Sequence, residues 1–266
     1  MMGAIIGDIA GSRFEASNHK SKDFELFTPH CSVTDDSIMT LAIAKAILEC
    51  RNNKESLGEL AVEHMQALGR LYPYCGFGGL FIQWVFSDDP EPYNSYGNGA
   101  AMRVSPCGYA AGSLEEAKEL SRRVTEVTHN HPEGLKGAEA TTVAVYLANA
   151  GRDLLEIREY IHTHYYPMTF TLDGIRPTYR FQASCQESVP QALIAFFEST
   201  GFEDAIRNAV SIGGDSDTIA AIAGAVAGAY YGIPEEIREE ALSFLDERLV
   251  GILEEFERRY PSTRII

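Results

Sequence analysis

Two short acidic clusters hold the side chains of this chain that are best suited to chemistry. The first is Thr34-Asp35-Asp36, in the stretch SVTDDSIMTLAIAKAIL, and the second is Asp215-Ser216-Asp217-Thr218, in SIGGDSDTIAAIAGAVAGAYYG. Each cluster stands where a loop passes into an apolar helical segment. The four carboxylates and two hydroxyls at these junctions are the oxygen ligands that a pair of divalent cations would require.

Helix capping is the alternative explanation for both clusters. Thr and Asp are favoured N-caps, and acidic side chains suit the positive end of a helix. Capping accounts for one or two residues of the first cluster, and for either Asp215 or Asp217 in the second. Adjacent carboxylates repel each other unless a cation lies between them, so the two clusters together favour a metal site. Helix N-termini carry a partial positive charge and disfavour cations. Two divalent ions and several carboxylates would therefore be needed to outweigh that charge.

Two histidine pairs are the rival metal sites. They would suit Zn²⁺, whereas ligands that are all oxygens favour Mg²⁺ or Mn²⁺. The pair in His162-Thr163-His164 lies in a predicted helix, where a spacing of two directs the side chains to different faces. The pair in His129-Asn130-His131 precedes Pro132, so it is loop-like and suits the lining of a pocket without binding metal.

Two glycine-rich loops are candidates for binding a phosphate. The segment YNSYGNGAAMR, residues 93–103, offers backbone N–H groups, hydroxyls and amides, and its Tyr96 could stack on a ring. The segment YCGFGG, residues 74–79, is similar. Ordinary turns would explain either loop taken alone. Neither is a Walker A loop, because no Gly-Lys-Ser/Thr follows, and the chain has no GxSxG nucleophile elbow.

The elements that position these residues are predicted to be helices. Apolar residues recur at i, i+3, i+4 and i+7 along most of the chain, and no strand-like alternation stands out. The predicted helices begin near residue 3, include stripes at 39–50, 57–68 and 114–127, and continue with Gly137–Ala150, Leu154–His162, Val189–Glu198, Phe202–Val210 and Glu235–Tyr260. Pro190 and Pro234 are expected near helix starts. Long loops, which are often functional, are expected at 16–36, 86–112 and 165–187.

The first predicted helix carries two stripes of different character. One is a smooth stripe suited to close helix contact: Gly3, Gly7 and Gly11. The other places three polar side chains on one face: Asp8, Ser12 and Glu15. A polar face on a helix of Ile and Ala suggests that it lines a site, with an exposed face as the alternative. Before the second acidic cluster, Gly213-Gly214 indicates a tight turn with room for a close approach.

Composition narrows the class of protein. The 22 Lys+Arg against 38 Asp+Glu give a formal net charge of −16, which disfavours nucleic acid as a general partner. The five scattered cysteines form no CxxC and indicate a reduced, cytoplasmic protein. The acidic N-terminus does not resemble a signal peptide, and the most apolar stretch, 219–233, is too short to span a membrane. Since no linker divides the chain, we expect a single compact all-α domain over residues 1–266.

In order and in content, five segments resemble the ADP-ribosylglycohydrolase family. They are GAIIGDIAGSRFE, TDDSIMTLAIAKAIL, SYGNGAAMRVSPCGYA, THNHPEGLKGAEAT and SIGGDSDTIAAIAGAVAGAYYG, and they span residues 3–232. The TDDS and GGDSDTIA elements are the specific ones. The resemblance implies a compact orthogonal bundle of helices, which agrees with the helical period.

The resemblance also implies a binuclear Mg²⁺ or Mn²⁺ centre and assigns residues to it. The implied metal ligands are Thr34, Asp35, Asp36, Asp215, Asp217 and Thr218. Glu15 matches the family's mobile acidic residue near the scissile bond and would act in catalysis with Asp36 and Asp217, while Asp8 has a supporting role. The implied substrate-binding residues are Gly76, Gly78, Ser95, Tyr96, Gly97, Asn98 and His129.

The implied reaction is hydrolysis of the bond between ADP-ribose and an acceptor on a protein or small molecule. Arginine is slightly preferred as the acceptor, because an acidic rim suits a guanidinium leaving group. Two alternatives stay open from the sequence: a non-catalytic protein that binds ADP-ribose, and a metal-dependent hydrolase of another nucleotide-like glycoside. The oligomeric state is also open.

Overall fold

The computed structural model describes residues 1–51 and 53–263 of the chain, and within these residues the architecture is helical. The one β-type pairing among them is an isolated bridge between Gly97 and Ser184. The helices are α1 (Met2–Ser12), α2 (Asp35–Cys50), η1 (Lys54–Ser56), α3 (Leu57–Leu71), α4 (Gly79–Val85), α5 (Gly99–Met102), α6 (Ser105–Ala110), α7 (Leu114–Thr125), α8 (Pro132–Asn149), α9 (Leu154–His164), α10 (Leu172–Ile175), α11 (Cys185–Phe197), α12 (Phe202–Val210), α13 (Ser216–Tyr231), α14 (Glu235–Leu242) and α15 (Glu247–Arg259). The predicted all-α class is confirmed.

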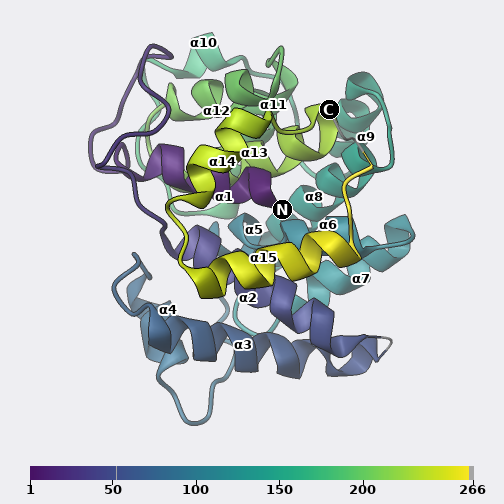
Figure 1. Cartoon of the computed structure of the whole chain (residues 1–266). Helices are drawn as coiled ribbons and strands as arrows, with labels where there is room; N and C mark the ends of the chain where they lie inside the picture. Colours follow the sequence, from purple (N-terminus) through teal and green to yellow (C-terminus); the bar gives the residue numbers. More distant parts are fainter. Residues whose placement is uncertain (52, 264–266) are drawn as a thin grey trace.

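Helix α13 is the centre of the fold. Its residues from Ser216 to Ala229 are all buried, as expected of a helix that is apolar on every side. It packs against α1, α12, α11 and α8. In Figure 1, α1 and α13 lie in the middle of the molecule, with α3 along one side and α10, α11 and α12 toward the opposite side. The acidic cluster at the start of α13 is therefore fixed from several directions.

Close packing of α1 on α13 depends on the predicted glycine stripe. A Cβ added at Gly7 would lie 2.0 Å from the backbone oxygen of Ala220, and one at Gly3 would lie 2.1 Å from that of Gly224. At Gly11 it would lie 2.5 Å from the backbone oxygen of Ser216. Only glycine permits this contact, so the prediction from the spacing is confirmed, and the backbone of α1 is held directly against α13.

The structure corrects two predicted helix limits. The segment predicted as one helix from Glu235 to Tyr260 is divided into α14 and α15, because the Asp246 side chain accepts hydrogen bonds from the N–H groups of Arg248 and Leu249 and starts a new helix there. Pro190 was expected near a helix start but lies inside α11, which begins at Cys185. Burial of the surrounding apolar residues outweighs the backbone hydrogen bond that this proline removes.

Two of the predicted long loops contain short helices. The segment 86–112 holds α5 and α6, and 165–187 holds α10 and the first turn of α11, whereas 16–36 forms no helix before Asp35. Helix α4 was not predicted at all. These helices are too short for their apolar period to stand out in the sequence.

The predicted helical face shared by Asp8, Ser12 and Glu15 is wrong in its last member. Helix α1 ends at Ser12, and the N–H of Phe14 bonds the carbonyl of Gly11 in the turn that follows. Glu15 therefore stands in a loop.

Among the described residues, no helix has both the length and the apolar character needed to cross a membrane. All five cysteines are free thiols.

Candidate active site

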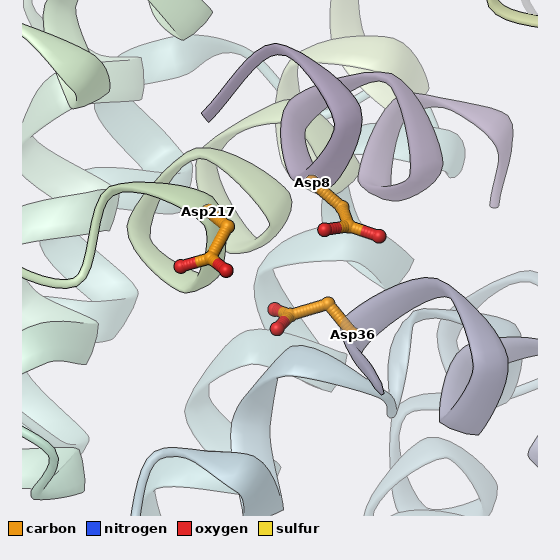
Figure 2. A group of neighbouring side chains, drawn as sticks. All are labelled: Asp8, Asp36 and Asp217. Carbon is orange, nitrogen blue, oxygen red and sulfur yellow. The ribbon is translucent and has the colours of Figure 1, made fainter. Parts of the chain in front are cut away.

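Three helices bring their acidic residues to one point. Asp8 comes from the middle of α1, Asp36 from the first turn of α2 and Asp217 from the first turn of α13. Figure 2 shows the three carboxylates pointing toward one another, and one oxygen from each lies within 4.8 Å of the others. The close contact of α1 with α13 along the glycine stripe places the carboxylate of Asp8 beside that of Asp217.

Asp8 ties α1 to the start of α2. Its Oδ1 accepts the hydroxyl of Thr34 at 2.5 Å, and its Oδ2 accepts the N–H groups of Thr34 and Ser37 at 3.0 and 3.1 Å. The Ser37 hydroxyl donates to Oδ2 as well. With four donors on its two oxygens, Asp8 positions the TDDS segment at the start of α2.

Capping does not explain Asp36 or Asp215. At the start of α2, the free N–H groups bond the side chains of Thr34 and Asp8, so Asp36 is not used as a cap. At the start of α13, Asp215 occupies the cap position but makes no side-chain cap hydrogen bond, and its Oδ2 instead accepts from Asn98 at 2.7 Å. These two carboxylates therefore do not serve as helix caps, whereas Asp217 does accept the N–H of Thr218 at 2.9 Å.

Burial leaves this group of carboxylates without a compensating charge. Asp36 and Asp217 are 2% and 4% exposed, and the Oδ1 of Asp36 is buried with no hydrogen-bond partner among the described residues. Burial and then the neighbouring charge of Asp217 hold the pKa of Asp36 well above its usual range. Burial and then Asp215 do the same to the pKa of Asp217. A divalent cation would fit here, since the donor set is oxygen and one buried oxygen has no partner.

A second acidic group extends the first toward the surface. One oxygen from each of Glu15, Asp215 and Asp217 lies within 4.8 Å of the others, so Asp217 belongs to both groups. Glu15 is exposed, and burial of its carboxylate followed by the charge of Asp215 raises its pKa. Thr218 donates its hydroxyl to Asp36 at 3.1 Å and joins the two clusters across the site. Asp35 lies beside them in the same cavity but in neither close group.

The loop that carries Glu15 is fastened to the turn before Asp215. The Asn18 side chain accepts the N–H of Gly214 at 3.1 Å, and the Lys20 ammonium donates to the carbonyls of Tyr179 and Ile212. Gly213 and Gly214 have φ values of +70° and +78°, a conformation that favours glycine. A Cβ on Gly213 would lie 2.4 Å from the Asn18 amide oxygen, so the predicted tight turn with a close approach is confirmed.

The acidic groups, apart from Asp8, form one part of a cavity of about 380 Å³, a size suited to a small ligand. Most residues proposed from the sequence line it: Glu15, Thr34, Asp35, Asp36, Gly76, Gly78, Ser95, Gly97, Asn98, His129, Asp215, Asp217 and Thr218. Tyr96 does not line the cavity. It is half exposed, and its ring lies 5.1 Å from that of His131.

The glycine-rich loop is fixed against α11 by backbone contacts. The N–H of Asn98 bonds the carbonyl of Ala183 at 2.8 Å, and the N–H of Cys185 bonds the carbonyl of Tyr96 at 2.9 Å. The Asn98 amide also donates to Ser188 at 3.2 Å, besides its bond to Asp215. This asparagine therefore links the loop to the acidic groups. An ordinary turn would not require this arrangement.

Some lining residues had no separate signal in the sequence. Phe181 is half exposed on the segment before α11, and Leu80 and Phe81 come from the short helix α4. No motif marks these positions. Arg103 is the last residue of the glycine-rich segment and is buried in the cavity wall, where a cation is unexpected.

The rival histidine sites do not form in the described part of the chain. No histidine belongs to either group of three side chains that could hold a metal ion. His162 Nδ1 accepts the N–H of Met168 at 3.0 Å, and His164 Nδ1 lies 2.9 Å from the carbonyl of Tyr160. Both are engaged in local structure.

The buried carboxylates predict an unusual pH dependence for the metal-free protein. Burial, opposed by hydrogen bonds from Ser37 and Thr34, raises the pKa of Asp8 to about 6, and burial with the charge of Asp8 raises that of Asp35 to about 7. These values exceed the unfolded values, so the folded state binds more protons between about pH 4 and pH 7, and its stability falls as pH rises through that window. Urea unfolding in a chelator should show a steeper fall for the wild type than for Asp35→Asn. Equal slopes would contradict the raised pKa of Asp35.

Comparison with known proteins agrees with this geometry. A sequence profile described as ADP-ribosylglycohydrolase matches residues 1–263. The human ADP-ribosylhydrolase ARH3 is 27% identical over 316 residues, which cover 88% of this chain and 85% of the human protein. The ADP-ribosyl-dinitrogen reductase glycohydrolase of Rhodospirillum rubrum is 32% identical over 169 residues, 60% of this chain and 54% of that protein.

The fold has a solved counterpart as well. A chain from a structure described as an ADP-ribosylglycohydrolase-related protein complex superposes with a TM-score of 0.69 at 23% identity, covering 97% of this chain and 96% of the other. At that identity the likeness concerns the fold. The profile match over nearly the whole chain carries the assignment, and the chain belongs to the ADP-ribosylglycohydrolase family, a family of glycosidic-bond hydrolases.

Proposed function

We propose that the protein, acting as a single domain in the cytoplasm, hydrolyses the glycosidic bond between ADP-ribose and an acceptor and releases ADP-ribose. One observation carries the proposal: the acidic groups, apart from Asp8, and the glycine-rich loop line the same cavity, joined by the hydrogen bond from Asn98 to Asp215. Family membership and the names of the relatives support the same reaction. The free cysteines agree with a reducing compartment.

The proposed cofactors are two Mg²⁺ or Mn²⁺ ions held by the acidic groups. The residues that would hold them are Thr34, Asp35, Asp36, Asp215, Asp217 and Thr218. Bound there, the ions would supply Lewis-acid charge to the ribose hydroxyls and lower the pKa of a water molecule. The buried, unpartnered Oδ1 of Asp36 supports this use of the carboxylates.

In the proposed mechanism, Glu15 is the general acid or base: it protonates the leaving group or accepts a proton from the attacking water. It lies at the exposed side of the acidic groups, where a leaving group could depart to solvent, and its raised pKa favours the protonated form that can donate to the leaving group. The loop Ser95–Asn98 would hold the diphosphate and adjacent ribose, with the N–H groups of Gly97 and Asn98 already donating to Ser95 Oγ and the Ala183 carbonyl. Gly76 and Gly78 would flank the same groove, which leaves room for the ligand where a side chain would not.

Replacement of Glu15 should separate catalysis from metal binding. Glu15→Gln keeps the shape of the side chain but cannot exchange the proton, so kcat should fall about 10²–10⁴-fold. The shift in melting temperature on adding Mn²⁺ should be retained, because the buried carboxylates are intact. A Glu15→Gln enzyme with wild-type kcat would contradict the role of Glu15.

Arginine is the proposed acceptor, although the site admits others. The carboxylate of Glu15 at the rim suits a guanidinium leaving group. A relative named ADP-ribosylarginine hydrolase Tri1, from Pseudomonas putida (strain GB-1), is 28% identical over 173 residues, which cover 61% of this chain and 46% of that protein. Proteins and small molecules carrying ADP-ribose on arginine, serine or an acetylated ribose should be assayed side by side, with free ADP-ribose measured as the product. Faster release from serine than from arginine would overturn the preference.

A further inference from the structure

A buried arginine stands behind the histidine of the cavity. Arg103 directly follows α5 and is 1% exposed, and its Nη2 donates to the hydroxyl of Thr128 at 2.6 Å. The same Nη2 lies 3.5 Å from Nδ1 of His129. The Thr128 hydroxyl is itself 2.7 Å from that Nδ1. These three side chains form one chain of contacts that ends at the cavity.

The contacts determine which ring nitrogen of His129 carries the proton. The guanidinium can only donate, so a proton on Nδ1 would face a second donor and a positive charge. Because Arg103 donates to the oxygen of Thr128, the proton of the Thr128 hydroxyl is free to point at an acceptor. Two acceptors are near this hydroxyl: Nδ1 of His129 at 2.7 Å and the carbonyl of Thr125 at 3.4 Å, and the shorter contact is favoured. His129 Nδ1 is therefore an acceptor, and the proton lies on Nε2.

The Nε2 atom faces the glycine-rich loop. It would lie 3.6 Å from a Cβ added at Gly97 and 3.5 Å from one at Gly99, and both glycines line the cavity with His129. A donor at this place suits an oxygen acceptor of a bound ligand, such as a phosphate oxygen or a ribose hydroxyl. The absence of side chains on these glycines keeps the approach to Nε2 open.

We propose that Arg103 is a positioning residue that, through Thr128, fixes His129 as a neutral Nε2–H donor to an oxygen of the ADP-ribosyl ligand. The identity of the ligand rests on the proposed function, whereas the tautomer of His129 rests only on the contacts described above. The environment of His129 also favours a neutral ring, because burial and then the charge of Arg103 hold the pKa of His129 well below its usual range. Burial lowers the pKa of Arg103 to about 10, which leaves it charged at neutral pH. Tyr93, 5.9 Å from the His129 ring, is neutral there too, since burial raises its pKa to about 12.

The test is nitrogen NMR of the full chain labelled at histidine, with the His129 signals assigned by their loss in His129→Asn. In the wild type, His129 should show the Nε2–H tautomer and no titration between about pH 5.5 and 8. Addition of ADP-ribose should shift its Nε2 signal. A proton on Nδ1, titration near an ordinary histidine pKa, or no shift with bound ADP-ribose would each overturn the proposal. The wild-type spectrum decides the tautomer even if a variant fails to fold.

Two variants of Arg103 separate positioning from a structural role. Arg103→Met removes the charge and the donor but keeps the length, so part of the His129 population should carry its proton on Nδ1 and ADP-ribose should bind about ten-fold more weakly. The pKa of His129 should rise toward its ordinary value, while burial still holds it lower. Arg103→Lys keeps the charge and should keep His129 neutral. If both variants leave the His129 titration as in the wild type, Arg103 has no positioning role. Failure of ADP-ribose to bind the wild type, with the Nε2–H tautomer present, would refute the proposed ligand and not the tautomer.

Discussion

Asp36→Asn should abolish the response to metal while making the metal-free protein more stable. In the absence of metal, Asp36 is buried beside Asp8 and Asp217, and one of its oxygens has no partner. An asparagine avoids the cost of burying this carboxyl group, whether as a charge or with a bound proton, so the free energy of unfolding in a chelator at pH 8 should rise by about 1–3 kcal/mol. The Mn²⁺-dependent increase in melting temperature should be lost, and turnover should fall about 10³-fold or more because the Lewis-acid contribution is several kcal/mol.

Asp88→Asn is the matched control, because it removes the same charge from an exposed aspartate. It should keep the Mn²⁺ response, the turnover and the metal-free stability of the wild type. The two measurements are thermal unfolding with and without Mn²⁺ and release of ADP-ribose. If Asp36→Asn destabilised the metal-free protein and retained the Mn²⁺ response, Asp36 would be a structural residue and the metal site would lie elsewhere.

Gly7→Ala is expected to be the most damaging conservative change on α1. The new methyl group would lie 2.0 Å from the Ala220 carbonyl oxygen, closer than any contact allows, and the neighbour is helix backbone that cannot rotate away. Overpacking of a core typically costs about 1–3 kcal/mol, and this contact belongs at or above the upper end of that range. Any relief moves α1 away from α13 and takes Asp8 away from Asp217, so metal affinity should fall together with stability.

Gly251→Ala provides the control for helix propensity. Gly251 is exposed on α15, and a Cβ there meets nothing within 4 Å. This change should be neutral or stabilise the protein by about 1 kcal/mol, because alanine is the better helix former. Urea unfolding and Mn²⁺ titration of both variants measure the two effects. A Gly7→Ala protein as stable as Gly251→Ala would show that α1 and α13 are not in direct backbone contact.

The sequence predicted which residues lie around one cavity better than it predicted the contacts that join them. The glycine spacing on α1 and the Gly-Gly turn before Asp215 had direct physical meanings, because each leaves space that only glycine provides, and both were confirmed. The acidic clusters were ambiguous between capping and metal binding. The structure removes capping for Asp36 and Asp215, since Thr34 and Asp8 satisfy the start of α2 and Asn98 takes the carboxylate of Asp215.

Other features of the site depend on contacts between segments that are distant in the sequence. The spacing of apolar residues along the chain does not reveal such contacts. The four donors that Asp8 receives come from the start of α2, so its place beside Asp36 follows from the packing of two helices. Glu15 was expected on α1 because its spacing from Asp8 is helical, but the chain turns after Ser12. Arg103 had no recognisable role until the fold placed Thr128 and His129 against it.

The two acidic clusters are proposed to form one metal site at which an ADP-ribosyl bond is cleaved. Release of ADP-ribose from an ADP-ribosylated acceptor, measured for the wild type and Asp217→Ala in Mn²⁺ and in a chelator, tests this proposal most directly. The wild type should release ADP-ribose in Mn²⁺, stop in the chelator and recover when metal is restored, while a folded Asp217→Ala should release none. Release by Asp217→Ala at the wild-type rate, or release by the wild type that a chelator leaves unchanged, would contradict the account.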